Sequence, residues 1–245
     1  VGPVIAAMVQ SLAGREGGAG TIDRSTVPGS PMDWRWNNPP RDMPDARRDI
    51  AAYDVLVLTE RAPVSNSMPW HDSPEMALRW FTHAWQEGRG GAGAETILYA
   101  TWVNTDSGPD HPNPYKDPEG HLPFRDRLPL EHARWEAIRD HVNANRPAGA
   151  PPMRMIPGPR LMAAVHDAIA DGSAPPGLAR VEDLFSDEIH LNGAGAYLVA
   201  LAHFAVIYGR DPREIPRNIG LRDIPAPETA VWMQALVAEV LGAGP

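Results

Sequence analysis

The 245-residue sequence contains no cysteine, which excludes disulfides, thiolate metal sites and cysteine nucleophiles. No stretch approaches the roughly 20 consecutive apolar residues that a membrane-spanning helix needs. Basic residues are outnumbered and scattered: 22 lysines and arginines stand against 31 aspartates and glutamates, for a net charge of −9. That balance disfavours non-specific binding to nucleic acid. We therefore expect no membrane span, no nucleic-acid partner and no thiol chemistry.

Apolar residues make up 43% of the chain, enough for a substantial core, and 27 prolines with 22 glycines imply long ordered loops between modest elements. The length suits one large α/β domain or two small ones. No segment has the composition of a convincing linker, and no internal repeat is evident. We therefore predict a single domain over residues 1–245.

Apolar, β-branched runs alternate with stretches of helical spacing along the chain. The runs predict buried strands at 53–59, 95–102 and 153–156, with a short strand near 21–23. Helices are predicted from the apolar spacing of residues 4–12 and at 73–87, 126–145, 159–171, 191–208 and 228–241, with Ser73 as an N-cap. Strands alternating with helices favour an α/β fold whose mainly parallel sheet is covered on both faces.

The first predicted helix begins at or close to residue 1, so no residues precede it to cap its free amides. A doubly wound sheet normally opens with a strand that leads into its first helix. We therefore expect a strand and a tight turn just before Val1. The alternative is that the chain starts here and the fold is a smaller variant.

Asp187 and His190 stand three residues apart, at the junction between a loop and a predicted helix. At this spacing the carboxylate and the imidazole can both turn towards one cleft. An imidazole oriented by a carboxylate is the general-base half of a serine-hydrolase site. The structural alternative is a helix-capping histidine that merely lies near Asp187.

Asp187-x-x-His190, continued by Leu191-Asn192-Gly193 ahead of a long apolar helix, gives the chain its resemblance to SGNH/GDSL-type hydrolases. The order of predicted elements resembles that family over nearly the whole chain. The resemblance implies a flavodoxin-like three-layer α/β/α sandwich of the esterase and acetylesterase kind, with no cofactor and no metal. It also implies a nucleophilic serine at the end of the first strand. That places the serine just before Val1, outside the numbered chain.

The family takes oxyanion donors from a glycine after the second strand and an asparagine after the third. Gly29 stands where that glycine is expected, but Thr59-Glu60-Arg61 replaces the usual Gly-x-Asn. An ionised Glu60 cannot donate a hydrogen bond. Arg61 could neutralise it, a protonated Glu60 could donate, or Asn104 could reach the same place. The structural alternative is an ion pair between Glu60 and Arg61.

Serines inside the chain are weaker candidates for the nucleophile. Ser30 follows the candidate oxyanion glycine and is the strongest of them. Ser11 lies inside the first predicted helix, where its hydroxyl would face backbone or solvent. Ser65 and Ser67 fall in a proline-rich segment and are predicted to form turns, and Ser186 is predicted to cap the turn ahead of His190.

The expected reaction is hydrolysis of an ester, such as an O-acetyl group on a carbohydrate or a small acyl ester, through an acyl-enzyme. His190 would act as general base, with Asp187 holding its tautomer. Glu60 and Trp102 would line the cleft, because ligands bind at the carboxyl ends of parallel strands. Trp34 could flank the same cleft and stack on a sugar or another apolar substrate; the alternative is that it pins a long loop.

Two other interpretations stay open. Without a nucleophile, the same fold could serve as a non-catalytic carbohydrate-binding or scaffold module, with Trp34, Trp36 and Trp102 in recognition. The loop 103–124 is rich in acidic residues and histidines that could ligate a hard metal or zinc, although their spacing matches no metal motif.

Overall fold

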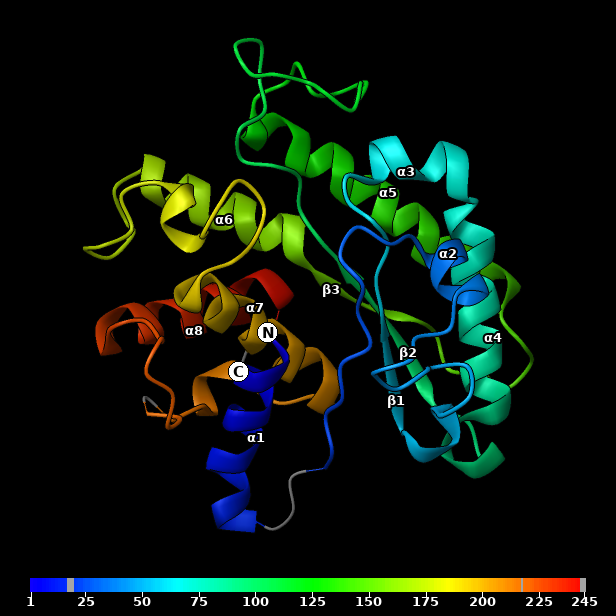
Figure 1. Ribbon diagram of the computed structural model, residues 1–245. Helices are drawn as coiled ribbons and strands as arrows, with labels where there is room; N and C mark the ends of the chain where they lie inside the picture. Colours follow the sequence, from blue (N-terminus) through cyan, green and yellow to red (C-terminus); the bar gives the residue numbers. More distant parts are fainter. Residues whose placement is uncertain (17–19, 217, 243–245) are drawn as a thin grey trace. The chain divides into compact units, whose positions relative to one another are not determined.

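The computed structural model in Figure 1 describes residues 1–16, 20–216 and 218–242. Its residues group into two compact units. Unit 1 comprises Val1–Asp23, Asn104–Asp106 and Pro157–Pro245, and unit 2 comprises Arg24–Val103 and Ser107–Ile156. The single domain predicted over 1–245 stays a prediction.

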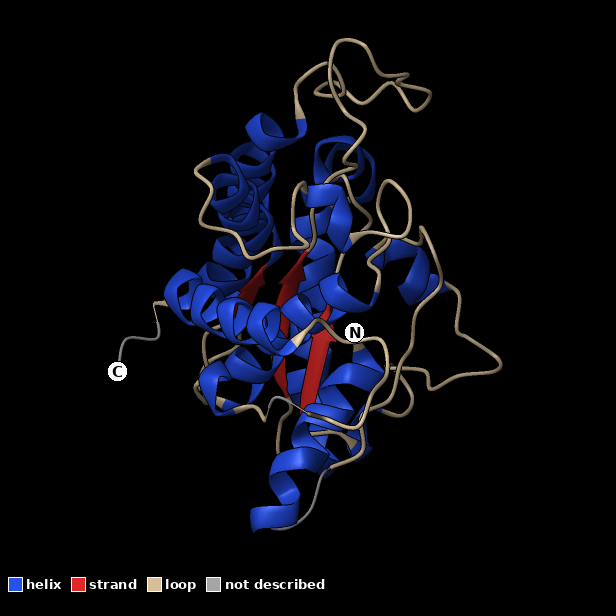
Figure 2. Cartoon of the chain, turned by 90° about the vertical axis from the view of Figure 1, so that its left-hand side faces the viewer, coloured by secondary structure: helices blue, strands red, loops and turns tan. Residues whose placement is uncertain are grey.

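Over the described residues, the sheet has three strands, β1 (Val55–Leu58), β2 (Glu95–Ala100) and β3 (Arg154–Pro157), in the order β1-β2-β3. β1 and β2 pair in parallel, with Val55 opposite Glu95 and Leu58 opposite Leu98. The strands are drawn in red in Figure 2. The chain is thus a mixed α/β protein with a parallel sheet flanked by helices, which confirms the predicted fold class and is consistent with a three-layer sandwich.

The helices of unit 2 are α2 (Met32–Asn37), α3 (Val64–His71), α4 (Ser73–Gly91) and α5 (Phe124–Asn145), with a short 3-10 turn at Ile50–Ala52. α4 and α5 pack on each other and on β2, since both carry large apolar side chains on one side. Their shared core contains Trp80, Phe81, Leu98, Trp135 and Ile138. This core fixes the strand ends that carry Glu60 and Trp102.

The helices of unit 1 are α1 (Gly2–Glu16), α6 (Gly158–Ala170), α7 (Gly193–Tyr208) and α8 (Pro227–Leu241), with 3-10 turns at Val181–Leu184 and Pro212–Glu214. α7 is apolar on all sides, and every residue from Tyr197 to Ala205 is buried. It packs against both α1 and α8, so it is the central helix of this unit. Among the residues that the structure describes, no helix is both long and apolar enough to span a bilayer.

Four predictions of local structure were wrong. No strand forms at 21–23, where all three side chains are exposed, Ile22 included. The supposed loop after Gly29 contains α2, and Ser65 and Ser67 lie buried in α3 rather than in turns. The N-cap of α4 is Asp72, in a left-handed conformation (φ 47°, ψ 46°), and Ser73 is the first helical residue.

Candidate active site

The segment between the turn Val181–Leu184 and α7 carries Asp187 and His190, and it closes on itself. Phe185 and Leu191 pair as an antiparallel bridge. Inside that bridge, both the amide and the hydroxyl of Ser186 donate to the carbonyl of His190, at 2.8 and 3.0 Å. The amides of the turn donate to Asp187 and not to Ser186, so the predicted capping role of Ser186 was wrong, and its hydroxyl instead helps to close the loop. The result is a short loop, residues 186–190, whose two ends are fastened together.

Asp187 accepts three hydrogen bonds within this 186–190 loop. Its Oδ1 accepts from the amides of Ile189 (2.9 Å) and His190 (2.6 Å), and its Oδ2 lies 2.8 Å from His190 Nδ1. The two amides, then the imidazole, lower the pKa of Asp187 to about 2, because each stabilises the charged carboxylate. Asp187 is therefore ionised at neutral pH.

An ionised carboxylate can only accept, so the hydrogen between the two side chains belongs to His190 Nδ1. The neutral imidazole then has its unshared electron pair on Nε2, which is the arrangement of a general base. The His190 side chain is 71% exposed. It therefore points outward, where a substrate can reach it, and not into the packed interior.

Asn192 fastens the 186–190 loop to the start of α7. Its Oδ1 accepts from the amides of Ala194 (2.9 Å) and Gly195 (3.1 Å), which caps the helix. Its Nδ2 donates to the carbonyls of Asp183 (2.7 Å) and Phe185 (3.3 Å), on the segment that leads into the loop. The sequence prediction began this helix at Leu191 and missed the cap, although an asparagine ahead of an apolar helix is a start signal.

Two glycines let the start of α7 lie against backbone. A Cβ on Gly195 would stand 2.2 Å from the carbonyl oxygen of Leu184, and one on Gly193 would stand 2.2 Å from that of Asp223. Neither contact is possible for a real side chain, so both positions need glycine. The close approach sets the position of the helix that His190 precedes.

Asn104 belongs to unit 1, and its neighbour Thr105 is hydrogen-bonded to the 186–190 loop. Thr105 donates to the carbonyl of Glu188 from its amide (2.8 Å) and from its hydroxyl (3.2 Å). The structure therefore brings the segment of Asn104 beside the loop of Asp187 and His190. Three of the predicted site residues belong to this part of unit 1.

Glu60 follows β1 in unit 2 and is 3% exposed. Its Oε1 accepts from the amides of Met32 (3.1 Å) and Arg61 (2.7 Å), so the carboxyl group caps the start of α2. Burial raises the pKa of Glu60, while the Arg61 amide, the Ser73 hydroxyl and the Met32 amide act in the opposite direction. The Arg61 guanidinium donates to Ser67. An oxyanion role for Glu60 stays a prediction.

Gly29 lies in a turn in which the amide of Ser30 donates to the carbonyl of Val27 at 3.1 Å. Its φ of +66° suits glycine, and with Pro28 ahead of it the segment has the sequence of a type II turn. The Ser30 hydroxyl also bonds the carbonyl of Val27, at 2.6 Å. That engagement makes Ser30 a poorer nucleophile than a serine with a free hydroxyl.

The tryptophans assigned to recognition have different surroundings. Trp36 lies edge-on against Trp80, with ring centroids 4.7 Å apart, and it holds the Arg79 guanidinium over its face. Trp102 is 4% exposed, whereas Trp34 is 43% exposed. Trp36 therefore pins its segment to the core, and Trp34 is the one of the three that offers a surface to a ligand.

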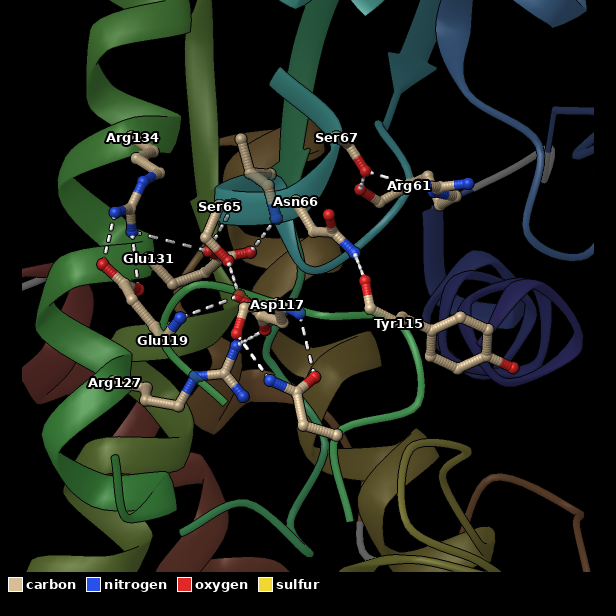
Figure 3. A network of polar contacts seen from close by, with 12 residues as sticks. Arg61, Ser65, Asn66, Ser67, Tyr115, Asp117, Glu119, Arg127, Glu131 and Arg134 are labelled. Atoms are coloured by element: carbon tan, nitrogen blue, oxygen red, sulfur yellow. Dashed lines mark hydrogen bonds and ion pairs between the residues drawn. The ribbon is translucent and has the colours of Figure 1, made fainter. Parts of the chain in front are cut away.

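Two acidic residues of the loop 103–124 pair with arginines. Asp117 contacts Arg127, and Glu119 accepts from Arg134 (Figure 3). Among the described residues, no group of three or more histidines and carboxylates has the geometry to hold a metal ion. Asp117 and Glu119 of this loop are thus engaged in ion pairs.

Comparison with known proteins adds little to this geometry. No family model matches the chain, and no curated protein matches it. Among solved structures, the chain is similar to a DUF4886 family protein from Bacteroides uniformis ATCC 8492, at 16% sequence identity and a TM-score of 0.49. The match covers 81% of this chain and 66% of the other, so the chain spans less than two thirds of that protein. At this distance the likeness carries no functional argument.

Proposed function

We propose that the protein is a serine-type ester hydrolase of the SGNH/GDSL kind, with His190 as general base and Asp187 as the group that orients it. The observation that carries the proposal is the 2.8 Å contact between His190 Nδ1 and an ionised Asp187, on an imidazole that solvent can reach. A histidine that only capped a helix would not need this tautomer. Here Asn192, and not His190, caps α7.

In the proposed reaction, His190 Nε2 takes the proton of a serine hydroxyl as the oxygen attacks the ester carbonyl. The same imidazole then returns the proton to the leaving alkoxide, and an acyl-enzyme remains. A water molecule, activated by His190 in turn, hydrolyses that intermediate. The charge of Asp187 stabilises the imidazolium in both steps. The serine is the one expected ahead of Val1.

Asn104 is the proposed oxyanion donor in unit 1. Its neighbour Thr105 donates two hydrogen bonds to the carbonyl of Glu188, so the segment is held beside the 186–190 loop. A neutral amide can donate to a developing oxyanion, which an ionised Glu60 cannot. Gly29 stays an expectation from the resemblance alone, and Glu60, which replaces the family's usual pattern, could donate only if protonated. The proposed substrate is a small acyl ester or an O-acetylated carbohydrate.

The test is hydrolysis of p-nitrophenyl acetate by the natural full-length protein. His190→Ala is expected to lower kcat/KM by about 10² to 10⁴, the usual contribution of a positioned acid–base group. His166→Ala is the matched control, because His166 is another surface histidine of unit 1 with an aspartate beside it, Asp167 at 3.6 Å. That control should hydrolyse at the wild-type rate. Equal rates for His190→Ala and the wild type would contradict the proposal.

A further inference from the structure

Glu131 of α5 lies at the centre of a polar network in unit 2 (Figure 3). Its side chain is fully buried. It accepts from the amide of Val64 at 2.6 Å and from that of Ser65 at 3.4 Å, so it caps the first turn of α3. The carboxyl group is therefore out of reach of solvent and is held by backbone amides.

The same network fastens the 107–123 loop, which joins β2 to α5. Arg127 and Arg134 of α5 bind Asp117 and Glu119 of the loop. The hydroxyl of Ser65 donates to Asp117 Oδ1 at 2.9 Å, which ties the loop to α3 as well. The loop is thus held to α5 by Arg127 and Arg134 and to α3 by Ser65.

The charges of this network do not balance. Three carboxylates (Asp117, Glu119 and Glu131) face two guanidinium groups (Arg127 and Arg134), and α3 contributes only backbone amides and a hydroxyl. Arg127 is engaged by Asp117, and Arg134 by Glu119. The nearest guanidinium nitrogen to Glu131 is Nη1 of Arg134, which lies 4.0 Å from Glu131 Oε2 and already binds Glu119. Ionised Glu131 would therefore be a buried charge without a cation of its own, which is costly.

We propose that Glu131 is a proton-controlled switch for the 107–123 loop. When the carboxyl group is protonated, Arg134 stays with Glu119 and the loop is held against α5. When the carboxyl group loses its proton, two carboxylates compete for one guanidinium, and the hold on Glu119 weakens. The loop is then expected to open more often.

Titration supports the direction of this switch. Burial raises the pKa of Glu131 from 4.5 to about 7, against the opposing effect of the Val64 and Ser65 amides and of Arg134 and Arg127. A carboxyl group whose pKa is higher in the folded state stabilises that state below pH 4.5 and loses this contribution as the pH rises through about 7. The loop should therefore be tight at pH 6 and looser at pH 8.5.

Hydrogen exchange of the loop amides tests the proposal. Gly120 and Leu122 donate to the carbonyls of Asp117 and Glu119, so their exchange reports loop opening. After correction for intrinsic exchange, their protection in the wild-type protein should fall by about tenfold between pH 6 and pH 8.5. Glu131→Gln cannot ionise and should show no such fall. Glu136→Gln, at a half-exposed position of the same helix, should behave like the wild type.

A second measurement covers the case in which Glu131→Gln fails to fold. Carboxyl carbon NMR of the wild-type protein should show one glutamate that titrates near pH 7. In Glu119→Gln, Arg134 is free for Glu131, and that titration should move to lower pH. Protection that does not change with pH, or the absence of any glutamate titrating above pH 6, would overturn the proposal.

Discussion

Replacing Asn192 by alanine should destabilise unit 1 more than the loss of an ordinary helix cap. The asparagine makes four hydrogen bonds: two accepted at the start of α7 and two donated to the segment ahead of the 186–190 loop. Alanine removes all four. It leaves the carbonyls of Asp183 and Phe185 without this donor and the amides of Ala194 and Gly195 without this acceptor.

The size of the effect follows from these contacts. Loss of an N-cap costs about 1 kcal/mol. The two donated hydrogen bonds contribute about 0.5 to 1.5 kcal/mol each, and the longer one, at 3.3 Å, the lesser share. Asn192→Ala should therefore lower the free energy of unfolding by about 2 to 3 kcal/mol.

Asn192→Asp separates the two functions of the side chain. An aspartate keeps an acceptor for the amides of α7, and the helix N-terminus favours its charge. It cannot donate to the carbonyls of Asp183 and Phe185. A carboxylate oxygen would stand against those two carbonyl oxygens where the amide nitrogen now lies, so the variant should lose at least the contribution of the two donated hydrogen bonds. Asn145→Ala is the control, because Asn145 is exposed at the end of α5 and bonds a single carbonyl, that of His141.

Urea denaturation, followed by circular dichroism, measures these differences. The control should stay within about 0.5 kcal/mol of the wild type. A loss of less than 0.5 kcal/mol in Asn192→Ala would refute the view that Asn192 holds the 186–190 loop to α7.

Three further predictions follow from packing and burial. Gly195→Ala places a Cβ against the carbonyl of Leu184 and should cost about 1 to 3 kcal/mol in urea denaturation, with hydrolysis reduced because the His190 loop shifts. Trp135→Ala empties a fully buried site in unit 2 and should cost about 3 to 5 kcal/mol, seen as a lower melting temperature. The wild type should lose roughly 3 kcal/mol relative to Glu131→Gln between pH 5 and pH 8.5, because the pKa of Glu131 rises from 4.5 to about 7 on folding; parallel pH profiles would contradict this.

The sequence predicts the main elements because their signals are local. The runs at 53–59 and 95–102 are mainly apolar and contain several β-branched residues, and they form β1 and β2 within two residues at each end. The apolar stretch 191–208 forms α7. The contact between Asp187 and His190 was foreseeable as well, because it spans only three residues.

The missed helices have causes that lie far along the chain. α2 begins where the amide of Met32 donates to Glu60, 28 residues away. α3 begins where the amide of Val64 donates to Glu131, 67 residues away. Neither helix has a side-chain cap of its own, so no local pattern announces it. The start of each helix is set by a buried carboxylate from a distant segment, and that carboxylate reaches the helix only in the folded protein.

The central claim is that His190 activates a serine, and covalent labelling tests it directly. The natural full-length protein should react with a fluorophosphonate and gain the mass of one phosphonyl group, on a serine that peptide mapping identifies. In His190→Ala the labelling rate should fall by at least about 10², since the serine has lost its base. Absence of any adduct, or a labelling rate unchanged in His190→Ala, would contradict the account.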